Sequence, residues 1–176
     1  MADDLTRTVA PGEWRAQVEA ALSEGNTVVD WLTAVDRTYE EPASLEIVAR
    51  LLTIGDSVGP GSVRGLRLST RIAPGESLES LTPLRPGFAF HERETHEMFG
   101  VVFDGFTDDT GLGLRPLLLP DGFEGTPLRK DFQLAARASK PWPGGKEPGE
   151  GHDSPKSPSR RRVQAPGVPP PEWGPR

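Results

Sequence analysis

The chain has 176 residues, a formal net charge of −6, a hydrophobic share of 35%, 20 glycines, 19 prolines and no cysteine. This length accommodates one domain and a tail, and the low hydrophobic share predicts that part of the chain lies outside any core. The absence of cysteine excludes disulfides, thiolate nucleophiles and Cys-ligated zinc or iron–sulfur sites, and the acidic balance argues against broad nucleic-acid binding.

The ends of the chain differ in composition from its middle. The first four residues, Met-Ala-Asp-Asp, are acidic and begin no apolar stretch, so we expect no signal peptide; nowhere do about 18 apolar residues follow one another as a membrane span requires. We predict a flexible N-terminus over residues 1–11, an α+β domain over 12–135 and a Pro/Gly-rich extended or disordered tail over 136–176.

The first predicted element is an amphipathic helix from residue 12 to residue 24. Pro11 can open it, and Gly25 stands where a helix ends. Its apolar residues recur at i, i+4, i+7 and i+8, namely Trp14, Val18, Ala21 and Leu22. We expect this helix to pack on a sheet through the Trp14 face.

Three strands are predicted to follow, over residues 27–36, 44–54 and 65–72. The first is rich in β-branched and aromatic residues. The second has Leu45, Ile47, Ala49 and Leu51 on one face and Val48, Leu52 and Ile54 on the other, which predicts partial cover on both sides. The third alternates, with Leu66, Leu68 and Ile72 facing in and Arg67, Ser69 and Arg71 facing out. Period two with one apolar face is typical of a half-buried antiparallel strand.

The second half of the domain is less regular. Residues 77–86 have leucines at helical spacing but are interrupted by Pro83 and Pro86, so the state of this stretch stays open. A helix is predicted from Phe88 to Phe99, with Gly100 as its stop. After it we expect an extended run over 101–106, a flexible polar loop over 107–113 and a second extended run over 114–120.

The order helix, three strands, helix, with connections of hairpin length, predicts an α+β fold. It would consist of an antiparallel sheet of three to five strands packed with two or three helices, plus an extended C-terminal arm.

The residues that could act in catalysis or metal binding are better explained by structural roles. His91 and His96 are separated by five positions, about 140° apart on a helix, so they cannot share one zinc ion as a spacing of four would allow. Arg93 and Glu97, at i and i+4, are expected to form a surface pair. The loop of residues 105–113 matches neither a P-loop nor a dinucleotide fingerprint. We therefore predict no catalytic, cofactor-binding or metal-binding residues.

The tail contains ten prolines and six glycines between residues 141 and 176, and six basic against four acidic side chains. Arg160–Arg162 could contact RNA, anionic lipid or an acidic subunit, although a solvated tail is the usual interpretation of three arginines. Trp142 and Trp173 would bury a large apolar area if the tail lay in a groove of a partner. Binding of the extended arm to a partner and plain disorder therefore both stay open.

Between residues 92 and 132, charged residues alternate closely with aromatic and aliphatic ones. The distinctive positions are Glu92, Arg93, Glu94, Glu97, Phe99, Gly100, Arg115, Pro127, Leu128, Arg129, Lys130 and Asp131, followed by Phe132. This pattern resembles the C subunit of NADH–quinone oxidoreductase, the 30 kDa subunit family of respiratory complex I. The family pattern is Glu-Arg-Glu, an acidic residue three positions on, an aromatic-Gly pair, and later Pro-Leu-Arg-Lys-Asp with an aromatic residue. Together with residues 32–36, which are similar to the family's first strand, the resemblance covers about residues 14–132.

The chain departs from the family pattern at four places. Gly105-Phe106-Thr107 and Gly125-Thr126-Pro127 stand where the family has Gly-His-Pro, Arg115-Pro116 replaces a double arginine, and Phe90 replaces a common Trp. These departures leave open which complex of the wider family the chain joins.

The resemblance implies a subunit without redox chemistry of its own, at the membrane periphery on the cytoplasmic side. Its partners would be the quinone-site subunit and the subunit with the terminal iron–sulfur cluster, and NADH, FMN, iron–sulfur clusters and quinone would belong to other subunits. Within it, Glu92, Arg93, Glu94 and residues 129–131 are expected to make ion pairs inside the chain and between subunits. The alternatives are the equivalent subunit of a hydrogenase-type or NADH-independent complex, and a stand-alone binding protein or enzyme.

Overall fold

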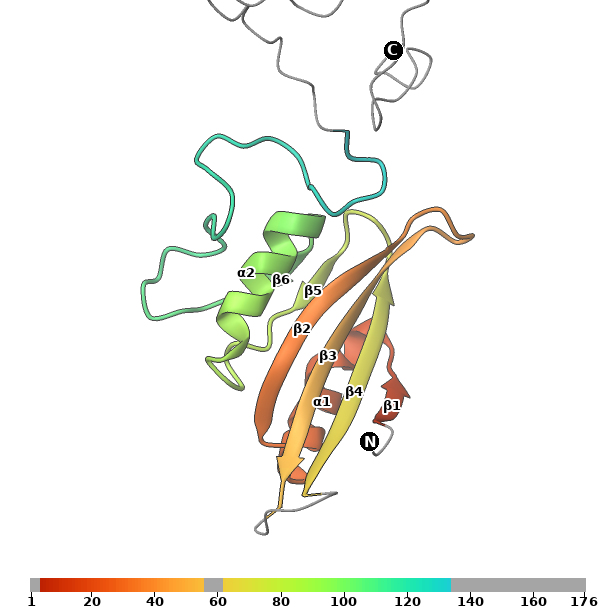
Figure 1. Cartoon of the computed structure of the whole chain (residues 1–176), viewed down its shortest axis with the longest axis vertical. Coiled ribbons are helices and arrows are strands. Elements are labelled where there is room, and N and C mark those ends of the chain that lie inside the picture. The colour runs from red at the N-terminus through yellow and green to blue at the C-terminus, as the bar shows by residue number, and fades with distance from the viewer. Residues whose placement is uncertain (1–3, 56–61, 134–176) are drawn as a thin grey trace, which may run out of the picture. The chain divides into compact units, whose positions relative to one another are not determined.

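The computed structural model describes residues 4–55 and 62–133 (Figure 1). In chain order the elements are β1 (Leu5–Thr8), the 3₁₀ turn η1 (Pro11–Glu13), α1 (Trp14–Ser23), β2 (Val28–Arg37), β3 (Ser44–Ile54), β4 (Val63–Ile72), β5 (Ser77–Glu79), α2 (Phe88–Phe99) and β6 (Val102–Asp104). The predicted bounds of β3 and α2 agree with the observed ones. The predicted tail lies outside the described residues.

The main sheet has four strands in the order β1-β4-β3-β2, and the α+β class is confirmed. β2, β3 and β4 are antiparallel neighbours, as predicted, whereas β1 runs parallel to β4, so the sheet is mixed. Residues 5–8 belong to the segment that we expected to be flexible. They are held in the sheet because the Val9 N–H donates to the Ser69 carbonyl at 2.8 Å and the Thr8 and Ser69 hydroxyls lie 3.3 Å apart. Ser69 is therefore buried instead of solvent-facing.

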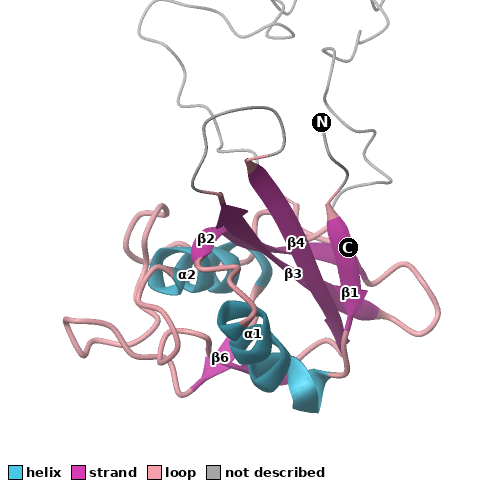
Figure 2. Ribbon diagram, turned by 90° about the horizontal axis from the view of Figure 1, so that it is seen from below, coloured by secondary structure: helices cyan, strands magenta, loops and turns pink. Residues whose placement is uncertain are grey.

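Both helices lie on one face of the main sheet (Figure 2). The inward side chains of β3 and β4, including Ile47, Ala49 and Leu68, are fully buried there, as their period-two pattern predicts. α1 contributes Trp14 and Val18 to the same core, in agreement with its predicted apolar face. The apolar core therefore lies between the sheet and the two helices.

The opposite face of the main sheet carries paired charges. At one end, Arg37 Nε lies 3.0 Å from Glu46 Oε2. At the other end, Arg50 Nε lies 2.7 Å from Asp4 Oδ2 and also pairs with Asp30. Each such pair contributes little stability because it is partly solvated, but together the pairs neutralise the charges on this face.

The ambiguous stretch between residues 77 and 86 is a short strand followed by turns. β5 pairs in parallel with β6 to form a second, two-stranded sheet. Leu78 and Leu81 are buried, so their burial explains the apolar spacing without a helix, which Pro83 and Pro86 would interrupt. Among the described residues, no helix combines the length and the apolar character needed to cross a bilayer.

Candidate functional site

The site is built on α2, which provides several of the distinctive residues. The aromatic side chains at its two ends, Phe88 and Phe99, are buried in the core. Gly100 ends the helix with φ of +78°, a conformation that a side chain would strain, and its N–H donates to the His96 carbonyl at 2.8 Å. His96 Nδ1 lies 2.8 Å from the carbonyl oxygen of Val101, so this ring is engaged with the chain that follows the helix.

Glu92 is completely buried and interacts with neutral groups. Its carboxylate accepts hydrogen bonds from the Leu81 N–H and the Ser80 hydroxyl, both at 2.6 Å. Burial raises the pKa of Glu92 to about 7, and the two hydrogen bonds only partly oppose this shift. Among the described residues Glu92 therefore forms no ion pair, unlike what we expected within the chain, because its buried carboxylate is bonded to Ser80 and Leu81.

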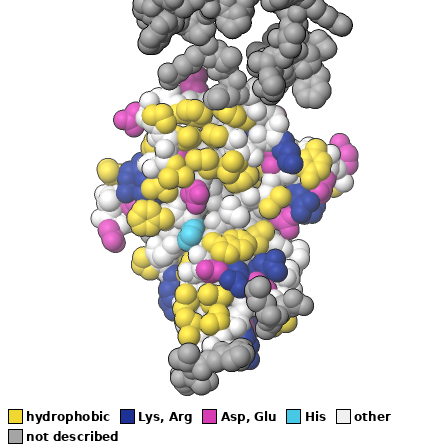
Figure 3. Space-filling model, viewed as in Figure 1, with side chains coloured by type: hydrophobic (Ala, Val, Ile, Leu, Met, Phe, Trp, Pro, Cys, Tyr) yellow, Lys and Arg dark blue, Asp and Glu magenta, His cyan; other side chains and the backbone are white. Residues whose placement is uncertain are grey.

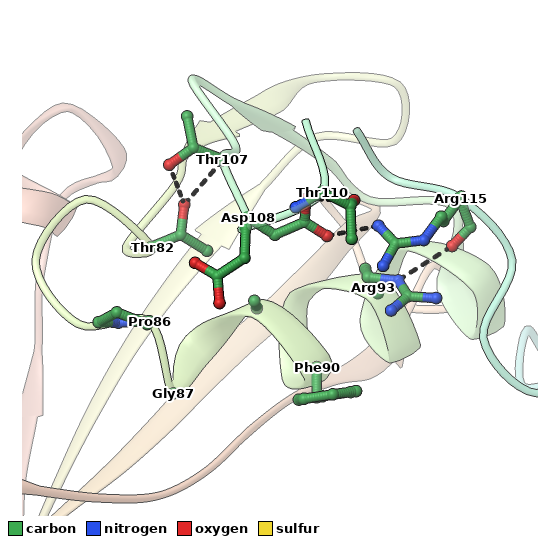
Figure 4. Close-up of a pocket in the computed structure, with 11 residues that line it drawn as sticks. Thr82, Pro86, Gly87, Phe90, Arg93, Thr107, Asp108, Thr110 and Arg115 are labelled. Carbon is green, nitrogen blue, oxygen red and sulfur yellow. Dashed lines mark hydrogen bonds and ion pairs between the residues drawn. The ribbon is translucent and has the colours of Figure 1, made fainter. Parts of the chain in front are cut away.

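A row of hydroxyl groups connects Glu92 with the start of the polar loop. The Ser80 and Thr82 hydroxyls lie 2.8 Å apart, and the Thr82 and Thr107 hydroxyls lie 3.4 Å apart. The Thr107 N–H also donates to Thr82 Oγ1 at 2.9 Å (Figure 4). The hydroxyl groups of Ser80 and Thr82 therefore connect the Glu92 carboxyl group with residue 107.

Arg93 and Glu97 bind the backbone of the loop instead of each other. Arg93 donates to the carbonyl oxygens of Arg115 at 3.2 Å and Pro116 at 2.7 Å. The N–H groups of residues 117, 118 and 119 donate to the Glu97 carboxylate at 3.1, 2.8 and 2.9 Å. Burial would raise the pKa of Glu97, but these three donors outweigh it and leave the pKa below its ordinary value. Arg93 and Glu97 therefore do not form the expected surface pair. Both side chains instead bind the backbone of residues 115–119.

The stretch predicted as a flexible polar loop over 107–113 is a folded turn organised by Asp108. Its carboxylate forms an ion pair with Arg115 and accepts hydrogen bonds from the N–H groups of Thr110 and Gly111, both at 3.0 Å (Figure 4). Arg115, and next the Thr110 hydroxyl, hold the pKa of Asp108 well below its usual range. An Asp that bonds its own downstream backbone is a common way to fix a turn.

The Pro-Leu-Arg-Lys-Asp run is fixed through Asp36, which lies on β2. The Lys130 N–H donates to Asp36 Oδ2 at 2.7 Å, and Arg129 Nε lies 3.5 Å from the same oxygen. Nearby, the Leu128 N–H donates to the Met98 carbonyl at 3.1 Å. Asp36 is almost completely buried, but the Thr38 hydroxyl and the Lys130 N–H outweigh burial, so its pKa lies below the ordinary value. The expected ion pair of Arg129 is present within the chain.

Sequence analysis missed Asp36 as a member of the site. Its signal was available: Asp36 follows Leu32 and Ala34 in period two, so it occupies an inward position of a strand. A carboxylate at such a position requires partners, because an unpaired buried charge is strongly unfavourable. The partners are 93 and 94 residues further along the chain, beyond the reach of any local pattern.

Other distinctive positions lie on the surface. Glu94, Lys130 and Asp131 are exposed, and so is Leu128 of the Pro-Leu pair. The large apolar side chains Phe90, Leu112, Leu118 and Leu128 are 65%, 71%, 61% and 55% exposed. Figure 3 shows that hydrophobic side chains gather on the part of this face where Figure 1 draws the chain after α2. The charged residues thus hold a loop whose leucines point outwards.

Within the described part of the chain, two of the clefts lie against α2. The larger, of about 510 Å³, has Phe90 and Arg93 from the helix on one side and Thr107, Asp108 and Arg115 on the other (Figure 4). The smaller, of about 310 Å³, lies between the C-terminal end of α2 and residues 114–126. Arg93, Asp108 and Arg115 in the larger cleft are already engaged with the loop, so the arrangement of these three favours structural support over chemistry.

Comparison with known proteins identifies relatives of the whole domain. The family model described as the respiratory-chain NADH dehydrogenase 30 kDa subunit matches residues 7–138. The C subunit of the NADH-quinone oxidoreductase of Jannaschia sp. is 32% identical over 133 residues, which cover 73% of this chain and 58% of that protein. A protein of Photorhabdus laumondii, named as the C/D subunit of NADH-quinone oxidoreductase, is 46% identical over 66 residues, which are 38% of this chain and 10% of that protein. The chain thus spans less than two thirds of the length of these curated relatives.

Two solved structures share the fold. The trypsin-resistant fragment of Nqo5 matches with a TM-score of 0.51 and 20% identity, covering 58% of this chain and 80% of the fragment. A chain of the membrane-bound sulfane sulfur reductase, an archaeal respiratory membrane complex, matches with a TM-score of 0.60 and 21% identity, covering 77% of this chain and 76% of that chain.

Proposed function

Because this chain belongs to the family of the respiratory-chain NADH dehydrogenase 30 kDa subunit, we propose that it is a non-redox subunit in the peripheral arm of a membrane-bound, proton-translocating NADH–quinone oxidoreductase. Its role is to dock on neighbouring subunits and to stabilise their assembly. The observation that carries this proposal is the match of the family model over 132 residues, from 7 to 138, which includes all the distinctive positions between 92 and 131.

The geometry of the site supports a docking role. Arg93 and Glu97 hold residues 115–119 by their backbone, and this stretch presents the exposed Leu118, while the exposed Leu112 precedes it. Exposed apolar side chains at a cluster of fixed positions are typical of a protein–protein interface. Fixing the loop in advance lowers the entropy that binding would otherwise cost.

The proposed partners are the quinone-site subunit and the subunit with the terminal iron–sulfur cluster. The Photorhabdus relative supports a close relation between the C and D subunits, because its name joins the two. NADH, FMN, iron–sulfur clusters and quinone would be bound by other subunits. Association with the cell membrane would be peripheral, on the cytoplasmic side, through these partners.

The equivalent role in an NADH-independent complex is the second candidate. The fold also occurs in a chain of the sulfane sulfur reductase complex, so the fold alone does not select the electron donor. The two candidates differ in the reaction that depends on the chain, and this difference can be measured.

The test is deletion of the gene followed by complementation. Membranes from the deletion strain should lose NADH-driven quinone reduction, and the large complex should disappear from native gels. A tagged copy of the chain should restore both and co-purify in equal amounts with the quinone-site and terminal iron–sulfur subunits. Normal NADH-driven quinone reduction without the chain would contradict the proposal, and loss of a different donor's quinone reduction would favour the second candidate.

A further inference from the structure

The exposed charges of the segment from residue 92 to residue 132 are almost all negative. Of its charged residues, the exposed ones are Glu94, Asp104, Asp109, Asp121, Glu124, Asp131 and Lys130, so that six acidic side chains accompany one basic side chain. The described residues 4–55 and 62–91 expose six acidic and four basic side chains, which is closer to balance.

This imbalance has a structural cause. Three arginines of the segment are directed to partners inside the chain: Arg93 to loop carbonyls, Arg115 to Asp108 and Arg129 to Asp36. Arg93 is buried, and Arg115 and Arg129 are only partly exposed. The contacts that fix the loop therefore remove positive charge from its surface.

Three of these exposed acidic residues are close in sequence to the exposed leucines. Asp109 precedes Leu112 by three positions, and Asp121 follows Leu118 by three positions. Asp131 likewise follows the exposed Leu128 by three. Figure 3 shows acidic side chains, together with some basic ones, around the area in which hydrophobic side chains gather. The loop thus has an apolar surface with an acidic rim, which we call the leucine face and define by Leu112, Leu118 and Leu128.

We propose that the leucine face docks on a protein surface that is apolar at its centre and lined by Lys and Arg at its rim. This inference rests on the proposed function and specifies the chemistry of the partner. Apolar contacts at the centre supply the affinity, while rim charges of opposite sign accelerate encounter and reject wrong partners.

The same charges disfavour other occupants. A second copy of the chain would bring an acidic rim against an acidic rim, which costs free energy through like-charge repulsion. Anionic lipid headgroups and nucleic acid are repelled for the same reason. A basic-rimmed protein surface is the one class that both the leucines and the acids favour.

The experiment measures association of the full chain with the purified quinone-site subunit, at low and at physiological ionic strength, by surface plasmon resonance. The test variant is D121K/E124K, which reverses two rim charges. Its matched control is E19K/E41K, the same charge change at two exposed acids of the sheet region. None of these four carboxylates takes part in a hydrogen bond or ion pair that the described structure contains.

At low ionic strength, D121K/E124K should slow association about tenfold, E19K/E41K less than about twofold, and added salt should abolish the difference. Leu118→Ser should mainly accelerate dissociation. Equal association rates for both charge variants, or faster association of D121K/E124K, would overturn the inference, and so would a dimer of the chain that Leu118→Ser dissociates. No binding of the wild-type chain at any salt concentration would instead contradict the proposed partner.

Discussion

The sheet region, residues 4–55 and 62–79, and the motif segment, residues 92–132, differ in how they place many of their charged and apolar side chains. The sheet region has leucine and isoleucine inside and paired charges outside, as at Ile47 and Arg50 of the same strand. In the motif segment, Glu92 and Arg93 lie inside, and Leu118 lies outside. The first arrangement is maintained by apolar burial, which is spread over many residues. The second depends on a few polar contacts to a backbone without helix or strand, so single substitutions should affect it locally and specifically.

Substituting one leucine in each region tests this contrast most strongly. Leu68→Ala removes a completely buried side chain and should lower the free energy of unfolding by about 2–5 kcal/mol. Leu118→Ala removes a side chain that is 61% exposed and should change it by less than about 0.5 kcal/mol. Chemical denaturation followed by circular dichroism measures both. Similar losses for the two variants would mean that the motif segment contributes a second apolar core.

The buried carboxyl group of Glu92 should give the motif segment an unusual dependence on pH. Its pKa is about 7 in the folded chain and about 4.5 when unfolded, so between these values the folded state keeps a proton that the unfolded state has lost. The free energy of unfolding therefore falls as the pH rises through this window, by up to about 3 kcal/mol, and the stabilisation present at pH 4.5 is absent above pH 7. Asp36 and Glu97 have lowered pKa values, so their contribution to the free energy of unfolding is lost as the pH falls into the more acidic range.

The variant Glu92→Gln separates this effect from the other carboxylates. Its amide oxygen can accept from the Leu81 N–H and its NH2 group can donate to the Ser80 oxygen, as a protonated carboxyl group can. We expect the variant to be as stable as the wild type near pH 5 and more stable near pH 8, as measured by thermal unfolding at both pH values. Glu94→Gln, which changes an exposed neighbour, is the control. A constant difference between Glu92→Gln and the wild type across this range would contradict the assignment.

The contact between Arg129 and Asp36 joins the two regions and should be the next most sensitive point. Arg129→Ala leaves a buried carboxylate without its cation, which should lower the free energy of unfolding by about 1–3 kcal/mol, because two N–H groups and one hydroxyl still bond to Asp36. Under the proposed function, assembly into the complex should decrease, while any assembled complex should keep its Michaelis constant for quinone.

Lys130→Ala is the matched control for Arg129→Ala. Lys130 bonds to Asp36 through its backbone N–H, which alanine retains, and its ammonium only lies 5.2 Å from the centre of the Tyr39 ring. We expect a change of less than about 1 kcal/mol and normal assembly on native gels. An Arg129→Ala complex that assembles normally but has an altered Michaelis constant would mean that this region acts on the quinone reaction.

The comparison of regions also explains which features could be predicted from the sequence. β3 and α2 were predicted with their observed bounds because burial on one face imposes a period that local sequence records. β1 has only four residues and no buried leucine, so no period exists to detect. The distinctive residues of the motif segment were identified, but not their partners. The sequence shows that Arg93 and Glu97 are charged. Their partners are backbone carbonyl and N–H groups, which nearly every residue has, so the sequence cannot indicate which of them are bound.

The smallest expected effect is the most local one, because Glu97 holds only residues 117–119. Glu97→Gln keeps one carbonyl oxygen but replaces the second acceptor with an amide that cannot accept, so part of the set of three N–H donors loses its partner. A lost hydrogen bond to a charged group at a partly exposed site is worth about 1 kcal/mol, which corresponds to about fivefold faster hydrogen exchange at these amides. Exchange in the core strand β3 should not change, since the sheet region does not depend on this contact, and Glu94→Gln should leave both sets of amides unaffected. Faster exchange in β3 as well would mean that the loop and the sheet open together, and the two regions would then be one cooperative unit despite their opposite construction.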